Sequence, residues 1–246
     1  MPRYILTLEY DGGAFSGWQR QQGAFTVQQA LEEAIFKLTG QHLETYGAGR
    51  TDRGVHATGQ VAHVQSPVPL SCDALRRGTN FHLGESPLRV LQAVEVPETF
   101  HARFSATFRR YRYVILNRPS ESVLQRGRVW WVHRPLSLQA MQEGAAHLVG
   151  HHDFSSFRSG ECQAKSALRT LDQLSIEQDG DHILFHVQSK AFLHNQVRIM
   201  VGSLKRVGEG VWPPSRIADM LDARSRPKAG PTAPPQGLYL TKVGYP

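Results

Sequence analysis

The chain has 246 residues and 40% hydrophobic content, values typical of a soluble globular protein with one large domain or two modest ones. Its 28 Lys and Arg against 21 Asp and Glu give a formal net charge of +7, which favours a polyanionic partner; a basic surface that only maintains solubility is the alternative. No apolar run is long enough to span a bilayer and no signal peptide opens the chain, so we expect neither a membrane anchor nor secretion. Cys72 and Cys162 lie far apart and match no metal-ligand spacing, so we expect neither a disulfide framework nor a zinc site, as fits the reducing cytoplasm.

The first part of the chain predicts an α+β half. Residues Arg3 to Tyr10 alternate in the period-two pattern of a strand. Apolar residues at helical spacing predict a helix over 27–38, in which Thr26 and Gln29 form a capping box and Gly40 provides the stop. The further predicted elements of this half are a strand over 60–65, a short helix over 72–77 and a strand over 88–96.

The remaining residues predict a second α+β half, so we divide the chain into residues 1–105 and 106–246. A helix over 138–149 is expected between Ser137 as cap and Gly150 as stop. Residues 223–236 are rich in Pro, Arg, Lys, Ala and Gly and predict a surface loop or flexible segment. The other predicted elements are strands over 108–116, 129–132, 171–178, 182–189 and 238–245, a helix over 191–207, and a short helix that ends at Leu221.

Asp52 is the leading candidate for a chemically active residue. It lies between Arg50 and Arg53, and neighbouring cations keep a carboxylate ionised, so we expect it to act as a base or nucleophile rather than as a proton donor. Loop acids beside arginines are more often caps or surface ion pairs. The surrounding glycines favour the functional interpretation because they suggest unusual backbone angles or a close ligand approach; they are Gly47, Gly49, Gly54 and Gly59.

Two candidates come from the second half. Arg198 lies at the edge of the apolar stripe of its predicted helix, where an ion pair with Asp52 would fix that acid's rotamer and charge; a solvent-exposed arginine is the alternative. Tyr111 lies in a strand where tyrosines alternate with arginines, from Arg109 to Tyr113. Such rings can stack on a splayed nucleotide while guanidinium groups contact phosphate, although strand tyrosines are more often core residues.

Other chemistries find little support in the sequence. The run His151-His152-Asp153 contains metal-binding residue types, but adjacent side chains on an irregular segment do not converge easily on one ion, so no metal is expected. No phosphate-binding Gly-x-x-x-x-Gly-Lys motif and no Ser-His-Asp arrangement is evident. ATP hydrolysis and serine hydrolysis are therefore unsupported.

Eight groups of residues, listed below in chain order, resemble motifs of the TruA family of tRNA pseudouridine synthases. Because the motifs are independent of one another and span most of the chain, a chance match is very improbable. The motifs are Glu9-Tyr10-Asp11-Gly12, Phe15-Ser16-Gly17-Trp18-Gln19-Arg20-Gln21, Gly49-Arg50-Thr51-Asp52-Arg53-Gly54-Val55-His56-Ala57, Phe100-His101-Ala102-Arg103-Phe104-Ser105-Ala106, Arg110-Tyr111-Arg112-Tyr113, Asp153-Phe154-Ser155-Ser156-Phe157-Arg158, Val197-Arg198 with Val201-Gly202, and Gly237-Leu238-Tyr239-Leu240.

The resemblance implies an enzyme that isomerises uridine to pseudouridine in the anticodon stem-loop of tRNA, at positions 38, 39 and 40, as a cytoplasmic homodimer without a cofactor. By the resemblance, Asp52 is the catalytic aspartate and Tyr111 the tyrosine that stacks on the substrate. Arg198 is the arginine that pairs with the acid, and Arg50 is the loop arginine that draws out the target nucleotide. The implied fold is α+β, with two related halves that form a mixed, mostly antiparallel central sheet, helices packed on it and the active-site cleft between the halves.

Two other functions stay open from the residues alone. One is a non-catalytic basic RNA-binding protein in which Asp52 supports a loop through Arg198. The other is a nucleosidase that hydrolyses the glycosidic bond instead of isomerising the nucleoside. The sequence also leaves open whether Asp52 adds to C6 of uracil, attacks C1′ or removes a ribose proton.

Overall fold

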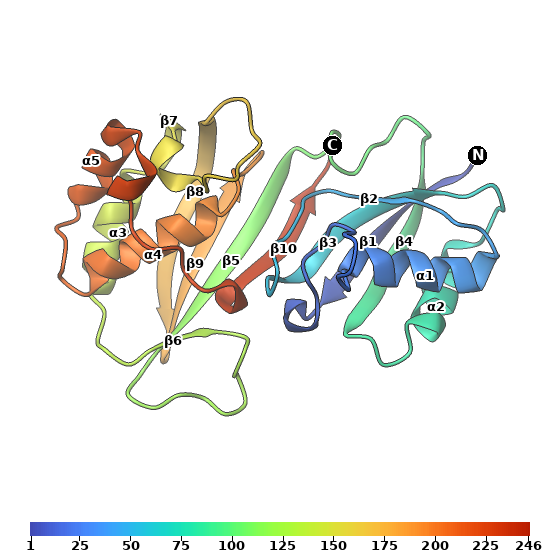
Figure 1. The fold of residues 1–246 in the computed structure, drawn as a ribbon, viewed down its shortest axis with the longest axis horizontal. Helices are drawn as coiled ribbons and strands as arrows, with labels where there is room; N and C mark the ends of the chain where they lie inside the picture. Colours follow the sequence, from blue (N-terminus) through green and yellow to red (C-terminus); the bar gives the residue numbers. More distant parts are fainter. The chain divides into compact units, whose positions relative to one another are not determined.

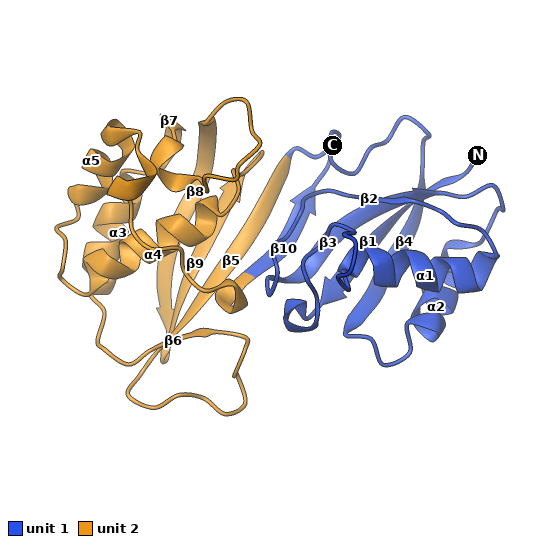
Figure 2. Ribbon diagram, in the orientation of Figure 1, with its two compact units in different colours: residues 1–107, 239–246 blue, residues 108–238 orange.

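The computed structural model describes residues 1–246, which divide into two compact units. Unit 1 contains Met1–Thr107 and Tyr239–Pro246, and unit 2 contains Phe108–Leu238 (Figure 2). The division predicted from the sequence assigns the last strand to the second half. In the structure this strand pairs with a strand of the first half, so Tyr239–Pro246 lies in unit 1.

Unit 1 is built on a sheet with the strand order β4-β1-β3-β10, and β2 pairs with β3 (Figure 1). The pairs are antiparallel except for β3 with β10, which is parallel. Residues Tyr4, Leu6, Leu8 and Tyr10 of β1 are buried and alternate with less buried neighbours. The elements of this unit are β1 (Arg3–Tyr10), α1 (Val27–Thr39), β2 (Thr45–Gly47), β3 (His56–Gln65), α2 (Cys72–Leu83), β4 (Leu88–Val96) and β10 (Leu238–Gly244), with a short 3-10 helix η1 (Gly12–Ala14).

The predicted α1 is confirmed together with its ends. The Thr26 hydroxyl accepts a hydrogen bond from the Gln29 amide, which satisfies one of the free N–H groups of the first turn. Gly40 ends the helix in the left-handed region at φ 70°, where a side chain would be strained. By contrast, α2 is six residues longer than the predicted 72–77, because its buried positions continue at helical spacing from Leu75 through Thr79 to Leu83.

Unit 2 has the strand order β5-β9-β8-β7, with β6 paired in parallel to β5 (Figure 1). The predicted strands over 171–178 and 182–189 form a hairpin, in which Asp179 pairs with His182 and Gly180 takes φ 55° in the turn. The elements are β5 (Phe108–Asn117), β6 (Trp130–Val132), α3 (Leu138–Ala146), β7 (Gly150–Asp153), β8 (Leu168–Asp179), β9 (His182–Ser189), α4 (Gln196–Gly208) and α5 (Arg216–Ala223), with 3-10 helices η2 (Ser155–Phe157), η3 (Arg226–Lys228) and η4 (Pro235–Gly237).

Two helix predictions in this unit were wrong at one end. The helix predicted over 138–149 ends at Ala146, and Gly150 opens β7 instead of stopping the helix. The helix predicted over 191–207 begins only at Gln196, because Asn195 lies in the left-handed region at φ 62° and cannot continue a right-handed helix.

The segment 223–236, predicted from its composition as a surface loop or flexible segment, is a loop that is ordered against α4. It crosses α4 at close range and buries Ala233, which is 1% exposed. The Gly230 amide donates to the Ser203 hydroxyl at 2.9 Å, and the Ala233 amide donates to the Arg198 carbonyl at 3.0 Å. A segment too polar to form a core by itself is therefore ordered by hydrogen bonds to a neighbouring helix.

The five α-helices and the mixed, mostly antiparallel strand pairing confirm the predicted α+β class. No helix in the chain has both the length and the apolar character needed to span a bilayer.

Candidate active site

Asp52 lies on a tight turn between β2 and β3. The Val55 amide donates to the Asp52 carbonyl at 3.1 Å, and Gly54 in the turn takes φ 80°, which the absence of a Cβ allows. Asp52 is half-buried, Thr51 behind it is buried, and Arg50 is exposed. The turn therefore presents a carboxylate that is partly shielded from water while its own backbone is fixed.

The segment after β1 lies directly against this turn. The Trp18 amide donates to the Thr51 carbonyl at 3.0 Å. Gly17 takes φ 93°, and a Cβ there would lie 2.8 Å from the Thr51 carbonyl oxygen, so only glycine allows this approach. A Cβ on Gly12 would likewise clash with the Val55 carbonyl.

At three of the four glycines around Asp52, the structure shows a positive φ or a close approach of neighbouring atoms that requires glycine. Gly54 provides the positive φ, whereas Gly47 and Gly59 provide space. A Cβ on Gly47 would lie 2.5 Å from the Trp18 indole ring, and one on Gly59 would clash with the Thr241 carbonyl of β10. These close approaches pack the backbone of β2, β3 and β10 around the turn that carries Asp52.

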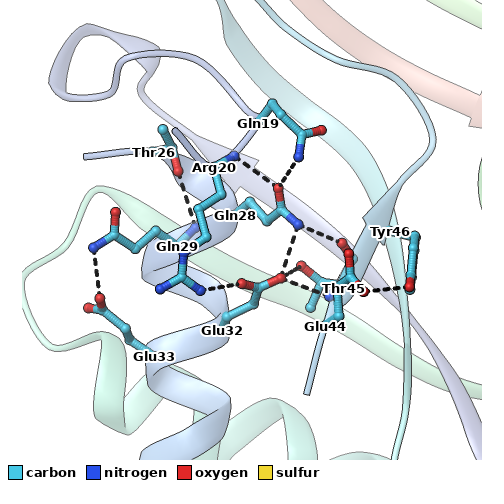
Figure 3. A network of polar contacts seen from close by, with 10 residues as sticks. All are labelled: Gln19, Arg20, Thr26, Gln28, Gln29, Glu32, Glu33, Glu44, Thr45 and Tyr46. Carbon is cyan, nitrogen blue, oxygen red and sulfur yellow. Dashed lines mark hydrogen bonds and ion pairs between the residues drawn. The ribbon is translucent and has the colours of Figure 1, made fainter. Parts of the chain in front are cut away.

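A buried carboxylate on α1 organises the neighbouring chain segments (Figure 3). Glu32 accepts hydrogen bonds from the Thr45 amide at 2.9 Å and from the Gln28 side chain at 3.0 Å, and its second oxygen pairs with Arg20 at 2.9 Å. Gln28 in turn accepts from the Arg20 amide at 3.0 Å. This network ties α1 both to β2 and to the Trp18–Arg20 segment that contacts the Asp52 turn.

In unit 2, Tyr111 projects from β5 opposite Val187 of β9. It is 9% exposed, and its ring makes an edge contact with Phe192 at a centroid distance of 5.2 Å and an interplanar angle of 89°. Tyr113, two residues along the strand, is fully buried and donates through its hydroxyl to the Pro234 carbonyl at 2.7 Å. Burial raises the pKa of Tyr113 well above its usual value, so it serves as a neutral core donor.

Arg198 is fixed within unit 2 at three points. Its Nε donates to the Ala233 carbonyl at 2.8 Å, one terminal nitrogen donates to Asn195 Oδ1 at 2.7 Å, and its own carbonyl accepts from the Ala233 amide. Asn195, which accepts one of these hydrogen bonds, lies in the left-handed region at φ 62° directly before α4. The sequence did not predict that Asn195 and Ala233 contact Arg198, because these contacts depend on how the 230–234 segment lies against α4.

The four predicted site residues are thus divided between the units. Asp52 and Arg50 belong to unit 1, whereas Tyr111 and Arg198 belong to unit 2. Their roles and the pairing of Asp52 with Arg198 stay predictions. The structure contains no group of three or more His, Cys, Asp or Glu side chains arranged to hold a metal ion.

Comparison with known proteins agrees with the sequence resemblance. A family model described as tRNA pseudouridine synthase matches residues 7–105 and 145–246, which include Asp52 and Arg198 but not Tyr111. The tRNA pseudouridine synthase A of Paramagnetospirillum magneticum is 52% identical over 245 residues, covering 100% of this chain and 96% of that protein. The enzyme of the same name from Rhodospirillum rubrum is 51% identical over 246 residues, covering 100% of this chain and 88% of that protein.

One solved structure, described as a Cbf5-Nop10-Gar1 complex, matches 98% of this chain at 14% identity with a TM-score of 0.39. The chain spans about half of that protein, 49% of its length. The family model and the full-length relatives at about half identity are sufficient by themselves, and they confirm the resemblance predicted from the motifs: the chain belongs to the tRNA pseudouridine synthase family.

Proposed function

We propose that this protein isomerises uridine to pseudouridine in the anticodon stem-loop of tRNA, at positions 38, 39 and 40, with Asp52 as the reacting carboxylate. The reaction breaks the bond from N1 to C1′, rotates the uracil and joins C5 to C1′; C5 loses its proton and N1 gains one. It needs one ionised acid and a pocket that retains the detached base. The observation that supports the proposal is a half-buried carboxylate on a turn whose backbone is fixed by hydrogen bonds and by close glycine contacts.

The other proposed roles follow from the demands of the substrate. A uridine in a stem must be flipped out, which costs a few kcal/mol. Stacking on Tyr111 and phosphate contacts from Arg50, which is exposed, would offset that cost. Arg198, already oriented by Asn195 and Ala233, would pair with Asp52 and keep it ionised.

The test is Asp52→Asn, which keeps the shape of the side chain and removes its charge. We expect tRNA affinity within about threefold of the natural protein and no tritium release from tRNA that contains 5-tritiated uridine. The control is Asp73→Asn, an exposed carboxylate on α2 that pairs with Arg76 on the same helix, which should leave release unchanged. Unchanged release in Asp52→Asn would reject the catalytic role and favour a basic RNA-binding protein.

Product analysis separates isomerisation from hydrolysis. Chromatography of digested tRNA should show pseudouridine without free uracil, whereas free uracil would indicate a nucleosidase. Transcripts with single uridines at positions 38, 39 or 40 identify the positions that are modified. We also propose a homodimer in the cytoplasm, to be tested by sedimentation of the purified protein and by fractionation of cells.

A further inference from the structure

A chain of buried polar groups lies beneath the turn that carries Asp52. Tyr10, at the end of β1, is 3% exposed, and its hydroxyl lies 2.8 Å from Thr51 Oγ1. Gln60 of β3 is fully buried; its amide nitrogen donates to the Gly49 carbonyl at 2.8 Å and to the Tyr10 hydroxyl at 3.5 Å. We propose that Tyr10 is a positioning residue for Asp52, acting through the hydroxyl of Thr51; the inference rests on the proposed function of Asp52.

The direction of the hydrogen bonds supports this role. The Gln60 amide has two protons, and they go to the Gly49 carbonyl and the Tyr10 oxygen. Because Tyr10 accepts from Gln60, its own proton is available for Thr51 Oγ1. Burial raises the pKa of Tyr10 to about 12, so the hydroxyl stays protonated throughout the neutral range.

The restraints lie on the residues next to Asp52. Thr51 is fixed at its side chain by Tyr10 and at its carbonyl by the Trp18 amide. The Gly49 carbonyl is fixed by Gln60. Asp52 follows Thr51 directly in the chain. The hydrogen bonds from the buried groups therefore restrict the backbone angles that set the direction of the Asp52 side chain. A reacting group held to within a fraction of an ångström is what rapid turnover requires.

The hydroxyl of Tyr10 has no packing purpose that a phenyl ring would not serve. The ring contacts Phe15 and Trp18, each at a centroid distance of 6.4 Å, and phenylalanine would make the same contacts. Burying a hydroxyl costs free energy unless it is hydrogen-bonded, so its presence is explained by the link to Thr51. The register of β1 against β3 also shifts between Leu8 and Tyr10, a local irregularity of the kind that redirects a side chain.

The experiment compares Tyr10→Phe with Tyr4→Phe. Tyr4 is a matched control because it lies on the same face of β1, is 1% exposed and has a hydroxyl that donates a part-buried hydrogen bond to the Leu70 carbonyl at 2.9 Å. The readouts are the single-turnover rate of tritium release, the Kd for tRNA and the Tm. We expect Tyr10→Phe to lower the rate by roughly 10- to 100-fold with Kd within about twofold. Tyr4→Phe should leave the rate within about twofold, even with an equal loss of Tm.

A second pair of variants tests the same link from its other end. Thr51→Ser keeps the hydroxyl and should retain most of the rate, whereas Thr51→Val keeps the shape and should lose as much as Tyr10→Phe. The two losses should not multiply in the double variant, because both remove one interaction. This pair keeps the proposal testable if Tyr10→Phe fails to fold.

The outcomes separate the two proposals. If Asp52→Asn is inactive but Tyr10→Phe matches Tyr4→Phe in rate, the positioning role is rejected and the proposed function stands. Losses that multiply in the double variant also reject the positioning role. If Asp52→Asn keeps its activity, the proposed function itself fails, whatever Tyr10 does.

Discussion

Gly202 lies in the middle of α4, at a position where one added methyl group should destabilise the protein. Helix propensity alone predicts that Gly202→Ala stabilises the protein, by about 1 kcal/mol. However, a Cβ at this position would clash with the Pro231 carbonyl oxygen and would lie 3.2 Å from the Ala233 nitrogen. Both atoms are backbone atoms of a segment already tied to α4 at Gly230 and Ala233, so the clash cannot be relieved by a rotamer change.

The magnitude follows from three contributions. Overpacking against a fixed backbone costs about 1 to 3 kcal/mol, and the two hydrogen bonds between Arg198 and Ala233 contribute about 1 kcal/mol each when the segment is displaced. After subtraction of the helix-propensity gain, the expected loss of unfolding free energy is about 3 kcal/mol. The clash with the backbone of Pro231 and Ala233, and not helix propensity, thus makes Gly202→Ala destabilising.

The measurement is urea unfolding followed by tryptophan fluorescence, with Gly160→Ala as the control. Gly160 has nothing within 4 Å of its potential Cβ, so this variant should stay within about 0.5 kcal/mol of the natural protein. A Gly202→Ala protein as stable as the natural one, or more stable, would refute the argument that the 230–234 segment is packed on α4. The variant should also weaken single-turnover activity, because the Ala233 carbonyl orients Arg198.

Two further predictions concern unit 1. Glu32→Gln should lower the unfolding free energy by about 2 kcal/mol, because an amide cannot accept from both Arg20 and the Thr45 amide as a carboxylate does. The control is Glu33→Gln, an exposed position on the same helix, which should change the unfolding free energy by less than about 0.5 kcal/mol. Equal urea midpoints for the two variants would contradict this prediction. Burial lowers the pKa of His63 to about 4 in the folded protein, whereas in the unfolded chain it is near 6.5. Between these two values the unfolded state binds the proton and the folded state does not. The unfolding free energy should therefore fall by up to about 3 kcal/mol as the pH drops from 6.5 to 4. His63→Gln should flatten that part of the pH profile, and an unchanged slope would show that other groups cause it.

Local patterns were sufficient for the elements whose residues interact mainly with near neighbours in the chain. The strand Arg3–Tyr10 and the start of α1 followed from the hydrophobic period and from Thr26 as cap. The same reasoning failed at the start of α4. Leu193 continues the apolar spacing and is buried, but its amide is capped by the Gln196 side chain, so the chain turns there instead of beginning the helix.

The chemistry of the candidate site was accessible from sequence because residue types and their spacing carry it. Asp52 among arginines and glycines, and the motifs around it, were enough to identify the family that the comparisons confirm. The supporting residues were not accessible. Composition predicted only a surface loop or flexible segment over 223–236, because it cannot show that Gly202 leaves space for Pro231 to approach α4.

The sequence by itself therefore determined the fold class, most of the strands and helices, the family and the candidate carboxylate, because these depend on periodicity and on short contiguous motifs. Only the tertiary structure decided which buried groups lie beneath the turn that carries that carboxylate. The Tyr10 hydroxyl and Thr51 are 41 residues apart, and their contact depends on the pairing of β1 with β3 and on the local shift in its register. A hydrogen bond requires atoms within about 3 Å, and no local pattern specifies a distance between segments so far apart in the chain.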